Sequence, residues 1–315
     1  MSVIVKESPI SEKDMVAEAE RALADISRIR DGVGRVIFGQ ESVVERTLVA
    51  LLAGGHALLV GVPGLAKTKL VETLGIVLGL DARRIQFTPD LMPSDILGSE
   101  VMEQDETGKR SFRFIRGPIF AQLLMADEIN RASPRTQSAL LQAMQEYHVT
   151  VAGARHDLPA PFHVLATQNP LEQEGTYPLP EAQLDRFLMQ IDILYPELEA
   201  ERRILLETTG IKDAKAQNVL NPGRLKEIQT LIRRMPVPES VVEAILNLVR
   251  SARPGQGAGL GNADTDKLVA WGPGPRASQA LMLCTRARAL YDGRLAPSTD
   301  DVRALAEPVL QHRMA

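Results

Sequence analysis

The segment most suited to chemistry is Gly61-Val62-Pro63-Gly64-Leu65-Ala66-Lys67-Thr68. It follows a run that predicts a strand and precedes a helix that we expect to begin near Leu70. In such a loop, backbone N–H groups point at phosphate oxygens, Lys67 neutralises the outer phosphates and the Thr68 hydroxyl ligates Mg²⁺. The residues expected to contact nucleotide are Gly61, Pro63, Gly64, Leu65, Ala66, Lys67, Thr68 and Lys69.

This segment departs from the strict phosphate-loop pattern at one position, because Ala66 stands where the last glycine is usual. Taken alone, it is either a phosphate loop or an ordinary glycine-rich turn. A second segment favours the phosphate loop: Leu123-Leu124-Met125-Ala126 predicts a buried strand, and two acids, Asp127 and Glu128, follow it directly. Asp127 suits the Mg²⁺ shell, and Glu128 suits the base that activates the water attacking the γ-phosphate. Together the two segments predict nucleotide hydrolysis.

The elements that must position these residues form an α/β arrangement. Short apolar runs predict buried strands at Ala57–Val60, Arg84–Phe87, Leu123–Ala126, Phe162–Ala166 and Met189–Leu194. Long crossovers between them indicate a five-stranded parallel sheet sandwiched by helices. Two intervening segments predict hairpins, Glu100–Arg116 and Tyr147–Leu158. After Pro196 only helical spacing remains, at Leu198–Glu207, Pro222–Met235, Pro238–Ser251, Ala277–Asp292 and Thr299–His312.

A leading helix is expected at Val16–Ile29, followed by a break at Asp31–Gly34. We therefore predict an N-terminal helix in residues 1–30, an α/β nucleotide-binding core with two hairpin insertions in residues 31–195 and an all-helical lid in residues 196–315.

Composition excludes several classes of protein. The 315 residues carry 36 Lys and Arg against 40 Asp and Glu, a net charge of −4, which disfavours a broad nucleic-acid surface. The single cysteine, Cys284, has apolar neighbours and is expected to be inert and buried. The uncharged run Leu48–Ala66 is interrupted by glycines and Pro63, so we expect no membrane span and a cytoplasmic protein. The histidines show no metal-ligand spacing.

Four motifs together resemble the MoxR family of AAA+ ATPases, in the helix-2-insert clade. They are the phosphate loop, Asp127-Glu128-Ile129-Asn130-Arg131-Ala132, Ala166-Thr167-Gln168-Asn169-Pro170 and the stretch from Glu174 to Phe187. The resemblance covers nearly the whole chain, and Ala66 is usual in that family. It implies an AAA+ core with a helical lid, and ATP and Mg²⁺ as cofactors.

The resemblance also implies roles for further residues. Asn169 matches sensor 1, which contacts the attacking water or the γ-phosphate; Asn before Pro is otherwise a common turn. Arg186 matches the arginine finger that reaches a neighbouring subunit, with a local ion pair to Asp185 or Glu181 as its alternative. Arg276 resembles sensor 2 and acts on its own or on a neighbour's nucleotide. The adenine pocket is expected at Phe38, Gly39 and Gln40.

The function implied is that of a chaperone-like ATPase that remodels protein clients. Its expected partners are copies of itself, in a ring that we expect to be hexameric, and proteins with von Willebrand factor A domains. Three alternatives stay open: a metal-chelatase-type motor subunit, a nucleic-acid-dependent ATPase, and a structural ring gated by nucleotide. Hairpin tips carrying Glu103, Asp105, Lys109 and Arg110, and Arg155 and His156, face either partners or solvent.

Overall fold

A five-stranded parallel sheet forms the centre of the α/β part of the molecule. The computed structural model describes residues 12–104, 108, 110–171, 175–209, 215–255 and 269–315. The strands lie in the order β2-β5-β8-β1-β9, with bounds β1 Ala57–Val60, β2 Ala82–Gln86, β5 Leu123–Asp127, β8 His163–Gln168 and β9 Met189–Asp192. All neighbours pair in parallel. The carboxyl ends of the strands therefore share one edge of the sheet, and the amino ends share the other.

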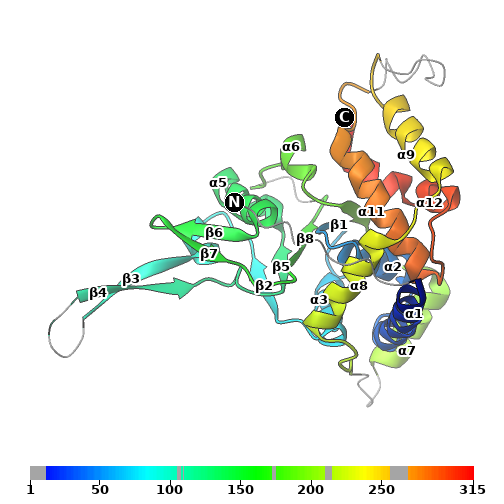
Figure 1. Ribbon diagram of the computed structural model, residues 1–315. Helices are drawn as coiled ribbons and strands as arrows, with labels where there is room; N and C mark the ends of the chain where they lie inside the picture. The colour runs from blue at the N-terminus through cyan, green and yellow to red at the C-terminus, as the bar shows by residue number, and fades with distance from the viewer. Residues whose placement is uncertain (1–11, 105–107, 109, 172–174, 210–214, 256–268) are drawn as a thin grey trace.

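Both faces of the sheet are buried because successive strand residues point to opposite sides. In β1, Leu58 joins a hydrophobic cluster with helix α5 (Pro134–Glu146). Ala57 and Leu59 join a second cluster with helices α2 (Glu41–Leu52) and α3 (Lys67–Leu78). Figure 1 shows α5 on one side of the sheet and α2 and α3 on the other. The expected sheet, covered by helices on both faces, is confirmed.

The helices that the structure describes have the following bounds: α1 Glu12–Gly34, α2 Glu41–Leu52, α3 Lys67–Leu78, α4 Pro93–Leu97, α5 Pro134–Glu146, α6 Glu181–Leu184, α7 Leu198–Thr208, α8 Pro222–Arg234, α9 Glu239–Ser251, α11 Pro275–Tyr291 and α12 Thr299–Leu310. Short 3₁₀ turns follow β5 (Ile129–Arg131) and α12 (Gln311–Arg313). The C-terminal helices pack against α2, because residues of α2, α8 and α11 belong to one hydrophobic cluster.

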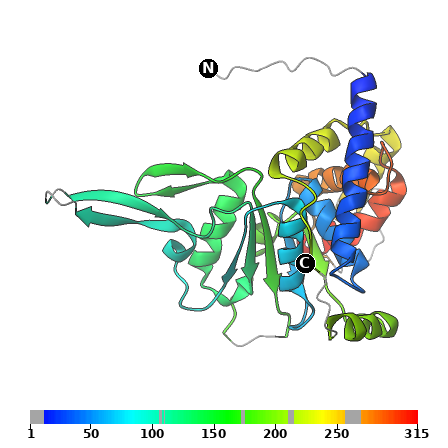
Figure 2. The same cartoon turned by 90° about the horizontal axis from the view of Figure 1, so that it is seen from below.

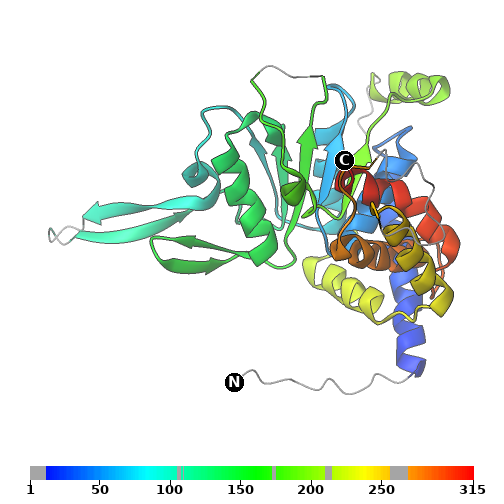
Figure 3. The same ribbon diagram turned by 90° about the horizontal axis from the view of Figure 1, so that it is seen from above.

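Two hairpins extend from the α/β part at the end away from the C-terminal helices (Figures 1 and 3). One pairs β3 (Gly98–Gln104) with β4 (Arg110–Arg116), and the other pairs β6 (His148–Val151) with β7 (Ala154–Asp157). The Phe114 and His156 rings stack with their centroids 4.0 Å apart, which joins the two hairpins. Both expected hairpins are confirmed; Asp105 and Lys109 of the first tip lie outside the described residues.

Several expected boundaries need correction. Helix α1 continues through Gly34, so the break expected at Asp31–Gly34 is wrong. The chain is held helical there by packing of α1 on α3, α8 and α11, which overrides the low helix propensity of glycine. Helix α3 begins at Lys67 rather than near Leu70, and the last helix ends at Leu310 before a 3₁₀ turn. The division at residues 30 and 195 stays a prediction.

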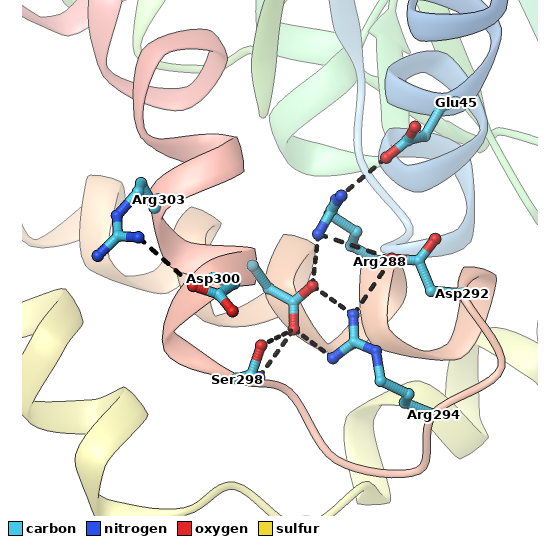
Figure 4. Close-up of polar contacts among 8 residues, drawn as sticks. Glu45, Arg288, Asp292, Arg294, Ser298, Asp300 and Arg303 are labelled. Atoms are coloured by element: carbon cyan, nitrogen blue, oxygen red, sulfur yellow. Dashed lines mark hydrogen bonds and ion pairs between the residues drawn. The ribbon is translucent and has the colours of Figure 1, made fainter.

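A cluster of charged side chains around the buried Asp301 joins α2 to the C-terminal helices (Figure 4). Arg288 of α11 contacts Glu45 of α2 at 3.0 Å and Asp301 of α12 at 2.7 Å. Asp301 is fully buried and also pairs with Arg294 at 2.6 Å. Because Asp301 accepts bonds from two guanidinium groups and from the Ser298 N–H, these donors outweigh the cost of burial and hold its pKa down at about 2.

Within the described residues, no helix combines the length and apolar composition that a membrane crossing requires. The same part of the chain holds no group of three or more His, Cys, Asp or Glu side chains arranged to bind a metal ion.

Candidate functional site

The phosphate loop connects the carboxyl end of β1 to the first turn of α3. Gly64 has φ +85° and Ala66 has φ +56°, both in the left-handed region. A side chain at Gly61 would place its Cβ 2.8 Å from the carbonyl oxygen of Ile193, so the loop passes close to the backbone after β9. Lys67 donates from Nζ to the carbonyl oxygens of Gly61 and Val62. The loop thus curls around its own lysine at a helix N-terminus, the arrangement that suits phosphate.

The left-handed conformation of Ala66 explains why glycine is usual at this position. A Cβ in that conformation costs roughly 1 kcal/mol, and alanine is the smallest side chain that carries one.

The acidic pair lies at the same edge of the sheet as the phosphate loop, on β5, and β8 separates β5 from β1. Asp127 is the last residue of β5, and Glu128 turns the chain with φ +55°. Thr167 of β8 links the two acids: its hydroxyl donates to Asp127 Oδ1 at 2.5 Å and accepts the Glu128 N–H at 2.8 Å. This one hydroxyl orients a carboxylate and the backbone of its neighbour.

Strand β2 holds the two carboxylates from the other side. Its register places Gln86 beside Asp127, and Gln86 Nε2 donates to Glu128 Oε2 at 2.7 Å. Arg84 donates to Asp127 Oδ2 at 2.6 and 3.1 Å and to Gln86 Oε1 at 2.8 Å. Arg131 donates to Glu128 Oε2 at 2.9 Å. The Glu128 carboxylate is therefore held through one of its oxygens.

Asn169 follows the carboxyl end of β8 and is 4% exposed. Its Oδ1 accepts the Leu171 N–H at 3.1 Å, and the preceding carbonyl, of Gln168, accepts the Gly61 N–H at 3.1 Å. The residue thus lies beside the start of the phosphate loop, while also forming the local turn that its sequence indicates.

A cavity of about 310 Å³ opens beside the phosphate loop. Its lining includes the expected residues Phe38 and Gln40, together with Lys69 of α3 and Ile204 of α7. Gly39 does not line the cavity; a Cβ there would come within 2.3 Å of the Ala200 Cβ, so this glycine lets α7 approach the loop. Mostly apolar walls next to a phosphate loop suit a nucleotide base.

Arg186 and Arg276 lie at the opposite edge of the sheet. A cavity of about 290 Å³ there is lined by Arg186, Arg233, Arg276 and Arg313, and by Gly54 and Gly55 before the amino end of β1. We call this the arginine pocket. Asp185 lies in it and contacts Arg313 at 2.8 Å and Arg276 at 3.6 Å. The Arg186 Nε atom is buried and has no hydrogen-bond partner among the described residues. The structure brings these arginines together at the amino ends of the strands, whereas the phosphate loop of the same chain lies at the carboxyl ends.

Comparisons with known proteins identify the family of this chain. A family model described as "ATPase family associated with various cellular activities (AAA)" matches residues 56–189, and one described as "AAA lid domain" matches residues 262–315. The chain is 44% identical over 296 residues to the protein named Chaperone MoxR1 of Mycobacterium tuberculosis, covering 94% of this chain and 75% of the relative. This chain belongs to the MoxR family of AAA+ ATPases.

Two further comparisons support the family assignment. Protein MoxR of Paracoccus denitrificans is 30% identical over 306 residues, covering 91% of this chain and 88% of the relative. A crystal structure of a protein from Cytophaga hutchinsonii superposes with a TM-score of 0.87 at 38% identity, covering 96% of this chain and 90% of that one.

The donor set of this MoxR-family site fits a magnesium ion bound with a nucleotide. Thr68 lies in the first turn of α3 and Asp127 ends β5, so a hydroxyl and a carboxylate are available at one edge of the sheet. Mg²⁺ prefers such oxygen ligands and keeps several waters. Both Asp127 oxygens accept protein hydrogen bonds, which suits a contact to the metal through a bound water.

Sequence reasoning missed Arg84, Gln86 and Thr167. Their signal is weak, because polar residues in short strands are common. Only the register of β2 on β5 and of β5 on β8 places them against the acidic pair.

Proposed function

We propose that this chain hydrolyses Mg-ATP at sites completed by a neighbouring copy of itself. The observation that carries the proposal is the separation of the two parts: the phosphate loop and acidic pair stand at the carboxyl edge of the sheet, and the arginine pocket stands at the amino edge. A chain built in this way can supply its arginines only to another chain. Contacts of this head-to-tail kind form a ring when the rotation between neighbours closes on itself.

Each residue has a proposed part in this reaction. Lys67 and the loop N–H groups hold the phosphates, and Phe38 and Gln40 border the adenine, with Gly39 between them allowing α7 to approach. Thr68 and Asp127 hold the metal, which when bound would neutralise charge on the β- and γ-phosphates. Glu128 takes the proton of the attacking water, and Asn169 orients that water.

Arg186 and Arg276 of the neighbour neutralise the charge that develops on the γ-phosphate. An arginine supplied in trans raises phosphoryl-transfer rates by about 10³ to 10⁵. Both arginines therefore act across the interface, and hydrolysis depends on assembly.

Hydrolysis would drive rearrangement of protein clients. The name of the Mycobacterium relative supports a chaperone-like role, and the two projecting hairpins offer surfaces for clients (Figure 2). A hexameric ring and partners with von Willebrand factor A domains remain predictions from the family resemblance.

Substitutions within one chain test the catalytic part. We expect Lys67→Ala to abolish ATP binding and hydrolysis. Glu128→Gln should abolish hydrolysis while ATP stays bound, because the amide keeps the shape of the side chain but cannot take a proton. Undiminished turnover in Glu128→Gln would remove this residue from the role of base.

Mixing two inactive variants tests the shared site. Arg186→Ala should fold and bind ATP yet lose most hydrolysis, and mixing it with Lys67→Ala should restore part of the activity through hybrid interfaces. Arg303→Ala, at an arginine whose side chain is 85% exposed, is the matched control and should behave as wild type. A lack of rescue together with a lowered melting temperature would assign Arg186 to structure.

A further inference from the structure

Helix α7 stands off the rest of the molecule and buries none of its residues (Figures 2 and 3). Large apolar side chains on the helix and in the segment leading into it are exposed: Leu194 76%, Tyr195 73%, Leu198 78%, Leu205 63% and Leu206 67%. A contiguous group of this kind is uncommon on the surface of a monomer and marks a contact site.

The contacts of α7 divide the helix into two faces. Ala200 approaches Gly39, and Arg203 lies over the Phe38 ring at 5.1 Å. Ile204 lines the cavity of about 310 Å³ beside the phosphate loop, which we call the nucleotide cavity. At 3.6 residues per turn these three share one side of the helix, and Leu198 and Leu205 share the opposite side. We call the side carrying Leu198, Arg202 and Leu205 the α7 outer face.

We propose that the α7 outer face binds a second copy of this chain, at the surface around its arginine pocket. The inference rests on the proposed function and adds to it the apolar contact that holds neighbouring subunits together. An arginine pocket that reaches a neighbour's nucleotide must approach the cavity at that nucleotide, and α7 forms one wall of this cavity. The α7 outer face of one chain and the arginine pocket of the next would therefore belong to one interface between subunits.

Charge favours this pairing. On the half of α7 that is turned away from the cavity, the acids Glu199 and Glu201 lie on either side of Arg202, whereas Glu207 lines the cavity. The arginine pocket has four lining arginines and a single acid, Asp185. Oppositely charged surfaces of this kind steer two subunits into one orientation.

The arginine pocket also offers apolar contacts. Tyr147, which is 48% exposed, and Leu188 and Leu283 belong to its lining. Leucine side chains on the α7 outer face would thus contact an aromatic ring and aliphatic groups, while the acids beside them face the arginines of the pocket.

The opposite faces of α7 imply that nucleotide binding and assembly influence each other. Residues Ile204, Glu207 and Thr208 line the nucleotide cavity, while the outer face contacts the neighbour. A ligand that orders α7 from the inside stabilises the surface that the second copy recognises.

Sedimentation velocity with Mg²⁺ and a non-hydrolysable ATP analogue tests the contact. We expect Leu205→Glu to weaken self-association at least about tenfold, because a charge replaces an apolar group buried on assembly. Leu246→Glu is the matched control: Leu246 is an exposed leucine, 41% exposed, on helix α9, and its substitution should leave self-association unchanged. Equal association of wild type and Leu205→Glu would overturn the proposal.

Cross-linking identifies the occupant. A chain with Leu198→Cys and a chain with Tyr147→Cys are mixed and treated with a short bismaleimide; Cys284 is buried, and burial raises the pKa of its thiol, so it reacts little. We expect a product that joins the two different chains. A product joining two Leu198→Cys chains, or a link formed only within one doubly substituted chain, would assign the outer face to a symmetric dimer or to this chain itself and overturn the proposal.

Failure of this inference is distinct from failure of the proposed function. If mixing Arg186→Ala with Lys67→Ala restores hydrolysis but Leu205→Glu still associates normally, the shared site stands and α7 is not its contact. A wild-type chain that stays monomeric with the ATP analogue and gives no rescue would overturn both.

Discussion

Glu128 illustrates how a single residue is prepared for chemistry. The left-handed turn at this residue directs its carboxylate back toward β2, where Gln86 and Arg131 both bind Oε2. Two donors on one oxygen fix the orientation of the side chain, and a general base contributes only when its geometry is maintained.

Replacing Gln86 tests this orientation. We expect Gln86→Ala to lower kcat roughly tenfold, a part of the 10²- to 10⁴-fold that a general base supplies, while the Kd for ATP changes little. Steady-state kinetics together with binding of a fluorescent ATP analogue separates the two effects. Gln142→Ala, at an exposed glutamine of α5, is the control and should leave kcat unchanged. Equal kcat values for Gln86→Ala and wild type would show that Arg131 alone orients Glu128.

Thr167 is expected to matter for stability as well as for the site. Thr167→Val keeps the shape of this fully buried side chain but leaves Asp127 Oδ1 and the Glu128 N–H without their partner. The free energy of unfolding should fall by about 1 to 3 kcal/mol, measured by urea denaturation. Thr167→Ser keeps the hydroxyl and should lose less; an equal loss would point to the methyl group instead.

At the scale of elements, α11 connects the parts of the molecule. It packs against α2, α8, α9 and α12, begins with Arg276 beside the arginine pocket and carries Arg288 near its other end. The contact of Arg288 with Glu45 joins this helix to α2, which leads into β1 and the phosphate loop. The position of the arginine pocket relative to the sheet is thus set by helix packing.

Asp301 should be a main contributor to that packing. Asp301→Asn removes the charge that Arg288 and Arg294 both bind, and breaking a buried ion pair in this way costs about 3 kcal/mol of unfolding free energy. The neighbouring Asp300 is 82% exposed and paired only with Arg303 at 3.5 Å among the contacts of the described residues. Asp300→Asn should therefore cost less than about 1 kcal/mol. Guanidinium denaturation of both variants gives the comparison, and similar losses would contradict this assignment.

At the scale of the whole molecule, three buried histidines make stability depend on pH. Burial lowers the pKa of His56 to about 3, that of His163 to about 4 and that of His312 to about 3. Each is neutral in the fold: His163, for example, donates from Nδ1 to the Gly55 carbonyl and accepts from Gln229 at Nε2.

The unfolded chain binds protons at these histidines below pH 6.5, while the folded chain does not. Their contribution to stability is therefore complete above pH 6.5 and is lost as the pH falls toward 4 and 3. Between pH 6.5 and 5 each histidine should cost about 2 kcal/mol. Melting temperatures from pH 7.5 to 5 should fall accordingly, and His163→Gln should fall less steeply than wild type. A melting temperature independent of pH in this range would show that the histidines are accessible to protons.

Much of this protein was determined by local sequence. The strands, the hairpins and the phosphate loop follow from apolar runs of strand length, from turn residues and from glycines at positions that need them, because these preferences act over a few neighbouring residues. The break expected at Asp31–Gly34 was wrong, because packing keeps α1 helical through residues of low helix propensity. The helix expected to begin near Leu70 begins one turn earlier, at Lys67.

Only the tertiary structure decided which distant residues meet. Gln86 and Thr167 reach Glu128 because strand register places β2 and β8 on either side of β5, and a register is a property of two strands rather than of one. Arg186 and Arg276 are separated along the chain, yet the return of α11 to the amino edge of the sheet gathers them in one pocket. In the sequence, the spacing of the α7 leucines is typical of an ordinary amphipathic helix. Their exposure, on a helix whose other side lines the cavity, is known only once the chain is folded.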